Sequence, residues 1–294
     1  MNANGGLVVG WIGADGARWQ VADSAWHDAA VRIRPDGASP HAFGLPAARE
    51  VPFPIGGGRV LRVEDGASVN CDGLHLHPHG DGCHAESVAH VLPADDARAL
   101  AGRAMLAATP PLLCGLLLDV ATEPLGATGE RYAGLHDAAD RVLTRRALER
   151  AWQDARAVAL DLPVEALLLR VYRPPLAESF DFSGSAAPYP TAEALDLLVG
   201  LGARWLIVDL PSIDREDDGG STPNHRRWWG LDGGDGHALD GPPALRGIVE
   251  LARFPAALPA GPVAVALGLA PIESDAVPAG LRVARLVRSE AHRP

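Results

Sequence analysis

The sequence predicts an α/β protein in which a parallel or mixed β-sheet is covered by helices. Strand-like and helix-like segments alternate along the 294 residues without a clean internal repeat. Several short apolar runs are continuous, as in strands that are buried on both faces. The segments between them show helical periodicity and capping residues, which is typical of covering helices.

The first half of the chain contains five such segments. Residues 6–11 and 59–63 are predicted strands, because glycine and proline punctuate them. The charged, alanine-rich residues 94–106 follow a proline and predict a helix. Residues 112–119 form a continuous apolar run and predict a buried strand. Residues 137–155 have helical periodicity and predict a second helix.

The second half repeats this alternation. Residues 166–171 predict a buried strand. Thr191 is the predicted N-cap of a helix that runs to Val199, and the glycines after it end that helix. Three more apolar runs predict strands at residues 203–210, 247–251 and 263–269.

The length allows one large domain or two modest ones, because a single core usually stops growing near roughly 250 residues. No segment of the chain has the composition of a convincing linker. We therefore expect one domain over residues 1–294, with the first 20 residues or so and the C-terminal tail peripheral to it.

Composition excludes several classes of function. The formal net charge of −11 and the lack of a large basic patch argue against nucleic-acid binding. No apolar run approaches the roughly 20 residues of a membrane span, and no secretory signal is visible at the N-terminus. The three cysteines cannot all pair, which indicates a reducing compartment and a cytoplasmic location.

Histidines are concentrated in one short stretch of the chain. Five of the eleven histidines fall within residues 75–90. Histidine is the commonest protein ligand for transition metals, and a nearby carboxylate compensates the charge of the ion. Gly80 and Gly82 allow a tight turn, and an extended chain after it would project His84 and Glu86 to the same side.

This stretch predicts a metal site for hydrolysis. Two ligands and a spare imidazole, His90, suit a metal that activates water and a histidine that moves protons. A surface tract that binds metals adventitiously is the competing interpretation. His75 and His77 alternate with leucines, as on the polar face of a strand, and are left out of the site.

Residues 79–90, His-Gly-Asp-Gly-Cys-His-Ala-Glu-Ser-Val-Ala-His, resemble the metal-binding motif of the cyclase family, which includes bacterial kynurenine formamidases and isatin hydrolase. The family pattern is Gly-Thr-His-x-Asp-x-Pro-x-His, and here Cys83, Glu86 and Val88 replace its threonine, aspartate and proline. The segment is more similar to a divergent branch with His-x-Asn-Gly-Thr-His-x-Glu-x-Val-Gly-His. Residues 205–220, Asn224–Trp229 and 247–251 resemble later motifs of that branch.

The resemblance implies a fold, a ligand set and an assembly. The fold would be a swivelling β/α/β domain, commonly dimeric or larger, with one or two zinc or manganese ions. By residue, it implies a first metal at His79, His84 and Glu86, a second at Glu86, His225 and Glu250, and His90 as the proton-transferring residue. It also places His41 and Phe43 near the substrate. Trp228 and Trp229 could line the substrate pocket, although large aromatic residues after a ligand more often pack beneath it.

The expected function is hydrolysis of an amide, lactam or ester bond of a small molecule, as in an arylformamidase. An inert protein that binds metal and ligand is one alternative, and an amidase that depends on Cys83 is another. Cys83 has three open roles: a thiolate ligand, a nucleophile or, as we favour, a small side chain in the threonine position. Asp209, Asp214 and Arg215 are expected to fix a loop through ion pairs or capping.

Overall fold

A computed structural model of the protein describes residues 10–22, 25–35, 37, 39–157, 162–231 and 246–289. Within these residues the largest sheet has ten strands, and seven of them form a closed ring. The order around the ring is β17 (Ala276–Arg288), β16 (Gly261–Leu269), β9 (Leu112–Asp119), β12 (Ala166–Arg170), β14 (Trp205–Val208), β15 (Gly247–Glu250) and β8 (His84–Glu86), which pairs back to β17. This mixed, sheet-dominated barrel with few helices confirms the α/β class that the sequence predicts.

Four consecutive strands of the ring, β9, β12, β14 and β15, are parallel. Every residue of β12, β14 and β15 is buried. Burial on both faces explains why these segments are continuous apolar runs in the sequence. Strands β8, β16 and β17 complete the ring by antiparallel pairing.

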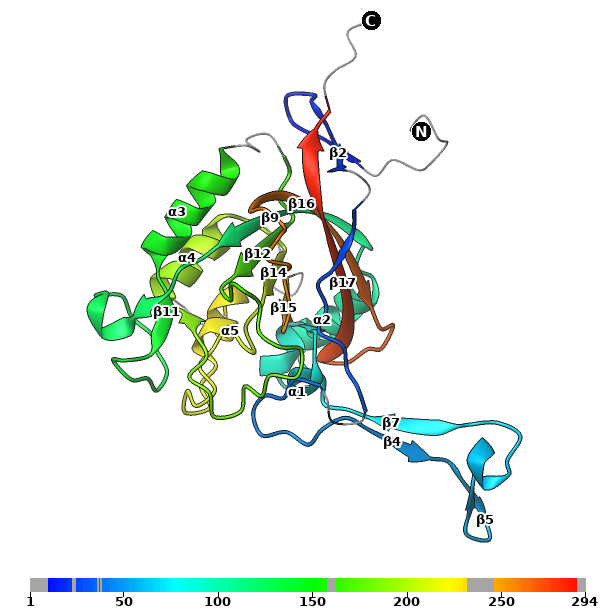
Figure 1. Ribbon diagram of the computed structural model, residues 1–294. Helices are drawn as coiled ribbons and strands as arrows, with labels where there is room; N and C mark the ends of the chain where they lie inside the picture. Colours follow the sequence, from blue (N-terminus) through cyan, green and yellow to red (C-terminus); the bar gives the residue numbers. More distant parts are fainter. Residues whose placement is uncertain are drawn as a thin grey trace, which may run out of the picture.

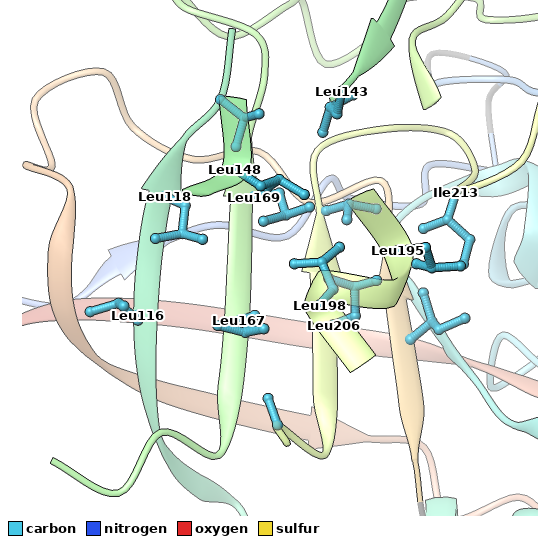
Figure 2. Packing of buried hydrophobic residues seen from close by; sticks show 14 of the residues in the cluster. Leu116, Leu118, Leu143, Leu148, Leu167, Leu169, Leu195, Leu198, Leu206 and Ile213 are labelled. Atoms are coloured by element: carbon cyan, nitrogen blue, oxygen red, sulfur yellow. The ribbon is translucent and has the colours of Figure 1, made fainter. Parts of the chain in front are cut away.

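Helices cover the outer face of the parallel strands (Figure 1). Alternate leucines of β9 and β12 pack against α3 (Arg145–Arg156) and α4 (Ala192–Gly200); Figure 2 labels Leu116, Leu118, Leu167 and Leu169 with Leu148, Leu195 and Leu198. The intervening Leu117 and Leu168 belong to a second cluster on the opposite face, which also includes Met105 and Leu106 of α2 (Ala97–Ala107). Burying one such side chain stabilises the fold by about 1.5–3 kcal/mol.

Shorter elements surround the ring. The N-terminal strands β1 (Gly10–Ile12), β2 (Arg18–Val21) and β3 (His27–Asp28) extend the sheet beyond β17. A small separate sheet contains β10 (Glu123–Pro124), β11 (Arg141–Leu143) and β13 (Tyr189–Pro190). The remaining helical segments are α1 (Pro78–Asp81), α5 (Pro223–Trp228) and the 3-10 turns η2 (Val63–Asp65), η3 (Val88–Val91) and η4 (Leu125–Ala127).

A two-stranded arm, residues 49–75, projects from the body of the molecule (Figure 1). It contains β4 (Arg49–Pro52) paired with β7 (Asp72–His75), and β5 (Pro54–Gly56) paired with β6 (Arg59–Val60). Of the exposed large hydrophobic side chains in the described residues, half lie on this arm: Phe53, Ile55, Val63, Val69 and Leu74. The arm thus exposes apolar surface away from the core.

Most predicted elements are confirmed, and their observed bounds differ from the predicted ones by at most a few residues. The strand over residues 112–119 has the predicted bounds, and the strands predicted at 166–171, 203–210, 247–251 and 263–269 correspond to β12, β14, β15 and β16. The helix predicted after residue 93 is α2. Thr191 is the N-cap of α4, and its side chain accepts a hydrogen bond from the Ala194 amide.

Two predictions about elements need correction, and a third lies partly outside the described residues. The helix predicted over residues 137–155 begins only at Arg145, because Thr144 caps it and Arg141–Leu143 form β11 with two buried apolar side chains. The predicted strand 59–63 is a strand only over Arg59–Val60. The strand predicted at residues 6–11 is seen as β1, and residues 6–9 lie outside the described part.

No helix in the described residues is long and apolar enough to cross a membrane.

Candidate metal centre

The centre is built on β8, whose short sequence carries two of the predicted ligands. His84 and Glu86 are separated by Ala85, which packs in the core on the other face of the strand. Because side chains alternate along a strand, the imidazole and the carboxylate share one face. Glu250 on β15 lies directly across the antiparallel pair from His84. Cross-strand partners are close neighbours, so pairing of β8 with β15 brings the third ligand to the other two.

Gly82 sets the direction in which β8 enters the sheet. Its φ is 149°, a backbone conformation that side chains rarely adopt. A Cβ atom at this position would lie 2.9 Å from Ile33 Cγ1. The Gly82 carbonyl oxygen also lies 2.9 Å from His84 Nδ1, which therefore donates a hydrogen bond to it. This glycine fixes both the chain path and the orientation of the His84 ring.

His79 is on the short helix α1, which begins with Pro78. Its Nε2 donates to Asp275 Oδ2 at 2.9 Å, and its Nδ1 lies 3.2 Å from Glu86 Oε2. His90, in η3, stacks close to it with ring centroids 4.1 Å apart. The two histidines at the ends of the predicted motif therefore meet above Glu86.

His225 approaches Glu86 from the opposite side, on α5. Its Nδ1 lies 2.7 Å from Asp214 Oδ2, and its Nε2 lies 2.8 Å from Glu86 Oε1 and 3.5 Å from Glu250 Oε1. Asp214 Oδ1 accepts hydrogen bonds from the Tyr132 hydroxyl and the Asn224 amide. A carboxylate held in this way fixes the ring of a metal-binding histidine and makes it a better ligand.

Four atoms at this point are buried and have no hydrogen-bond partner within the described residues: His84 Nε2, His225 Nε2 and both Glu86 carboxylate oxygens. Such atoms are rare in native proteins, because an unpaired buried polar group costs about 1–3 kcal/mol. The short distances between them do not have hydrogen-bond geometry. Nitrogen and carboxylate oxygen are the donor set of zinc and manganese sites, so the residues fit a divalent ion.

Two groups of potential metal ligands lie close together in this centre. His84, Glu86 and Glu250 have ligand atoms within 4.8 Å of one another, and so do His79, Glu86 and His90. Glu86 is common to both groups, with one oxygen toward His225 and the other toward His79. Its longer side chain, relative to aspartate, therefore lies between two potential ion positions.

In this centre, histidines and carboxylates stabilise each other's charged forms. Burial alone would raise the pKa of Glu86, but the charges of His225 and His90 keep it well below its usual range. Burial would lower the pKa of His225, but Glu86 and Asp214 raise it well above its usual value. Burial would likewise lower the pKa of His79, but its hydrogen bond to Asp275 and the nearby negative charge of Glu86 raise it to about 10. The carboxylates therefore stay charged and favour cations in this pocket.

A cavity of about 370 Å³, called here the site cavity, opens beside the ligand cluster. It is lined by Phe43, Leu45, His79, His90, Ser212, Asp214, Arg215, Glu216, Asp218, Gly220, Thr222, His225 and Glu250. Its volume lies in the range of small-molecule sites. The ligand cluster thus lies at the wall of a space that can admit a substrate.

The three residues expected near the substrate have different positions. Phe43 lines the site cavity. His41 does not; its Nδ1 lies 3.9 Å from Asp81 Oδ1, and its backbone bridges to Asp181. Trp228 does not line the cavity either, because it is fully buried and stacks on the Arg246 guanidinium at 5.1 Å. Trp228 instead packs in the hydrophobic core at the C-terminal end of α5, the helix that also carries His225.

Cys83 points away from the ligand cluster. It is buried in the core cluster that also contains Ala85, and burial raises the pKa of its thiol to about 12. A thiol in such surroundings is unreactive. This position fits the interpretation of Cys83 as a small side chain in place of threonine.

Two further carboxylates hold histidine rings of the cluster, and only one of them is named in the sequence analysis. The sequence predicts that Asp214 fixes a loop, and the structure shows that it also holds the ring of His225. Asp275, immediately before β17, binds His79 and was not expected. In the sequence, Asp275 is only an acidic residue before an irregular strand, and it lies far along the chain from the histidine motif.

No family model matches the sequence, and no curated protein matches it. Solved structures do match the fold. A predicted metal-dependent hydrolase from Bacillus stearothermophilus has a TM-score of 0.52 and 15% identity, over 88% of this chain and 97% of that one. A potential metal-dependent hydrolase with cyclase activity has a TM-score of 0.51 and 14% identity, over 90% of this chain and 99% of that one.

Isatin hydrolase A from Labrenzia aggregata, solved with benzyl benzoate, has a TM-score of 0.56 and 14% identity, over 90% of this chain and 94% of the other. These likenesses extend over nearly the full length of each partner. They show that this chain shares its overall fold with these proteins.

Proposed function

We propose that this protein, which has the fold of cyclase-type hydrolases, uses one or two divalent metal ions to hydrolyse an amide, lactam or ester bond of a small molecule, as an arylformamidase does. The observation that carries the proposal is the convergence of buried, unpaired ligand atoms from His84, Glu86 and His225 at the wall of the site cavity. Their chemistry is that of a zinc or manganese site.

The proposed ligands divide between two ion positions. His79, His84 and Glu86 would hold the first ion, and Glu86, His225 and Glu250 the second. The separate directions of the two Glu86 oxygens support a bridging role. When bound, such an ion supplies Lewis-acid chemistry that activates water and polarises a carbonyl group.

His90 is the proposed proton-transferring residue. It lines the site cavity and is partly exposed, with 27% of its side chain accessible. Its Nε2 lies 4.0 Å from Glu86 Oε2, and its Nδ1 lies 3.7 Å from Asp275 Oδ2. Asp275 can therefore orient the ring, while Nε2 accepts a proton from the attacking water or delivers one to the leaving group.

The rest of the site cavity positions the substrate. Phe43 and Leu45 contribute apolar surface opposite the charged cluster, and this surface can exclude water from a bound aromatic or aliphatic group. The Ile213 amide donates to Glu250 Oε1 at 2.8 Å, so that Glu250 is held in place before any ligand binds. Preorganisation of this kind lowers the cost of reaching the transition state.

The test is a panel of formamides, lactams and aryl esters offered to metal-loaded wild type and His90→Asn. We expect turnover of at least one class by wild type, and a fall in kcat of roughly 100- to 10,000-fold in the variant with metal content unchanged. Full metal content with no turnover of any class would mean an inert metal- and ligand-binding protein. Activity that survives chelation but dies on alkylation in a Cys71→Ser background would favour Cys83 as the nucleophile.

We propose further features on the strength of the resemblance. These are a swivelling β/α/β arrangement, assembly as a homodimer or larger homo-oligomer, and a cytoplasmic location. The projecting arm, with its exposed apolar side chains, supports assembly.

A further inference from the structure

A second cavity lies next to the site cavity, and we call it the side cavity. Its volume is about 330 Å³, and it is lined by Asp140, Gly184, Ser185, Ala186, Ala187, Tyr189, Arg215, Glu216 and Asp217. Arg215 and Glu216 line both cavities and form the ridge between them. A molecule that extends beyond the metal centre across this ridge would enter the side cavity.

A narrow third space has lining residues in common with both cavities. It measures about 10 Å³ and shares Phe43 and Ser212 with the site cavity and Ser185 and Ala187 with the side cavity. A space of this size holds about one water molecule.

The backbone at Phe43 ties the walls of both cavities together. Phe43 has a φ of 61°, which is rare for a bulky residue. The Gly44 amide donates to Ser183 Oγ at 3.1 Å, and the Phe182 amide donates to the His41 carbonyl at 2.7 Å. Strained backbone held by neighbouring contacts is common where a protein clamps a ligand.

Charge in the side cavity is unbalanced. Arg215 Nε donates to Asp140 Oδ2 at 2.9 Å, and this pair is neutral as a unit. Glu216 and Asp217 are both exposed; Asp217 Oδ2 lies 4.0 Å from Arg215 Nη1, whereas Glu216 forms no ion pair within the described residues. Glu216 uses only one oxygen, Oε2, to accept the Gly184 amide at 2.7 Å. The side cavity therefore has an excess of negative charge with a carboxylate oxygen free for a ligand.

A hydroxyl group adds a second, independent feature. Ser185 Oγ is buried and has no hydrogen-bond partner within the described residues, and Ser185 lines both the side cavity and the narrow space. A buried hydroxyl without a partner is costly, and a bound polar group would satisfy it. The side cavity thus presents a free carboxylate, and an unpaired hydroxyl lies covered in its wall.

We propose that the side cavity is a substrate subsite for a cationic, hydrogen-bond-donating group such as a primary ammonium, with Glu216 as its charge partner and Ser185 as an acceptor. The substrate would then have two parts: a scissile carbonyl group at the metal centre and a positively charged group beyond the Phe43 and Arg215 ridge. This role rests on the proposed function, because the side cavity selects a substrate only if the site cavity turns one over.

The experiment measures binding and turnover separately. Binding uses three non-hydrolysed benzamides with a para aminoethyl, ethyl or carboxyethyl group, titrated calorimetrically into metal-loaded protein. Turnover uses the three formanilides with the same substituents. Glu216→Gln removes the charge but keeps an oxygen for the Gly184 amide, and Asp154→Asn removes an exposed carboxylate of α3 that lines neither cavity.

We expect wild type to bind the aminoethyl benzamide roughly fivefold more tightly than the ethyl one, the size of effect that one partly screened charge pair produces. This preference should vanish in Glu216→Gln, persist in Asp154→Asn and weaken at high salt. Equal binding of the three benzamides, or tightest binding of the carboxyethyl compound, would overturn the subsite. Preferential binding without turnover of any formanilide would support the subsite and contradict formanilide hydrolysis.

Discussion

The two ring nitrogens of His225 have different surroundings, and this difference defines its role. Nδ1 is committed to Asp214, while Nε2 faces Glu86 without a hydrogen-bond partner in the described residues. The same division holds for His84, whose Nδ1 is committed to the Gly82 carbonyl. In each case one hydrogen bond fixes the tautomer that leaves the inward nitrogen free to bind an ion.

Asp214→Asn tests this orientation at the scale of one residue. The amide removes the negative charge that favours the Nδ1–H tautomer. Its NH2 group, which cannot accept a hydrogen bond, replaces one of the two oxygens that accept from His225 or from Tyr132 and Asn224. We expect zinc affinity, measured by competition with a chelator, to fall roughly 10- to 100-fold. Tyr132→Phe keeps the carboxylate and should lose less. Zinc affinity equal to that of wild type in Asp214→Asn would show that the ring needs no such support.

At the scale of elements, the centre depends on how β8 enters the sheet. The strand is only three residues long, yet it pairs with both β15 and β17 and so closes the ring. The same pairing brings Glu250 next to His84. Closure of the barrel and assembly of the ligands are therefore one structural event.

Gly82→Ala should disturb both the closure of the barrel and the assembly of the predicted ligands. The new Cβ would approach Ile33 Cγ1 to 2.9 Å at a φ of 149°. We expect the free energy of unfolding to fall by about 1–3 kcal/mol in urea titrations, together with reduced metal binding. Gly200→Ala is the matched control, because a Cβ there meets nothing within 4 Å and alanine is the better helix former. Equal stability of Gly82→Ala and wild type would contradict the strain argument.

The elements differ in how well local sequence predicts them. Strands such as β9 and β12 are predictable because burial on both faces requires continuous apolar runs. The long strand β17 is not, since Pro278, Gly280 and Arg282 interrupt its pattern and its conformation depends on pairing with β16 and β8. Closure of the ring, which β17 provides, is a tertiary property without a local signal.

The residues of the candidate site also differ in how well local sequence predicts them. His79, His84, Glu86 and His90 lie in one short stretch, so their density alone indicates a site. His225 and Glu250 are distant in the chain and could be assigned only through the motif resemblance. Asp275 is indicated neither by the local density of histidines nor by the motif resemblance. It lies just before β17, and only the fold brings it to His79. Residues that the fold brings together over long distances are the ones that local pattern cannot predict.

At the scale of the whole molecule, the projecting arm is the main departure from a compact shape (Figure 1). A two-stranded ribbon has little stability of its own in water, and this one exposes Phe53, Ile55 and Leu74. Both ends of the arm lead into the site: Phe43 and Leu45 precede it, and α1 with His79 follows it. The arm is thus continuous in the chain with segments that line the site cavity.

If the chain assembles as proposed, the arm should contribute to the interface. The double variant Phe53→Ser and Leu74→Ser is expected to weaken self-association at least about tenfold in analytical ultracentrifugation, as loss of apolar anchors does. Leu100→Ser is the matched control, because Leu100 on α2 is 55% exposed, as is Phe53. A wild type that stays monomeric at all concentrations, or a double variant that assembles like wild type, would contradict this role.

The most direct measurement is the metal content of the untagged protein by elemental analysis, comparing wild type with His84→Ala and with His75→Ala. His75 belongs to the same histidine-rich stretch but lies exposed on the arm, so its loss should change nothing. We predict one or two equivalents of zinc or manganese in wild type and His75→Ala, and a loss of at least one in His84→Ala. A well-folded wild type that carries no metal and cannot be loaded with it would contradict the metal centre.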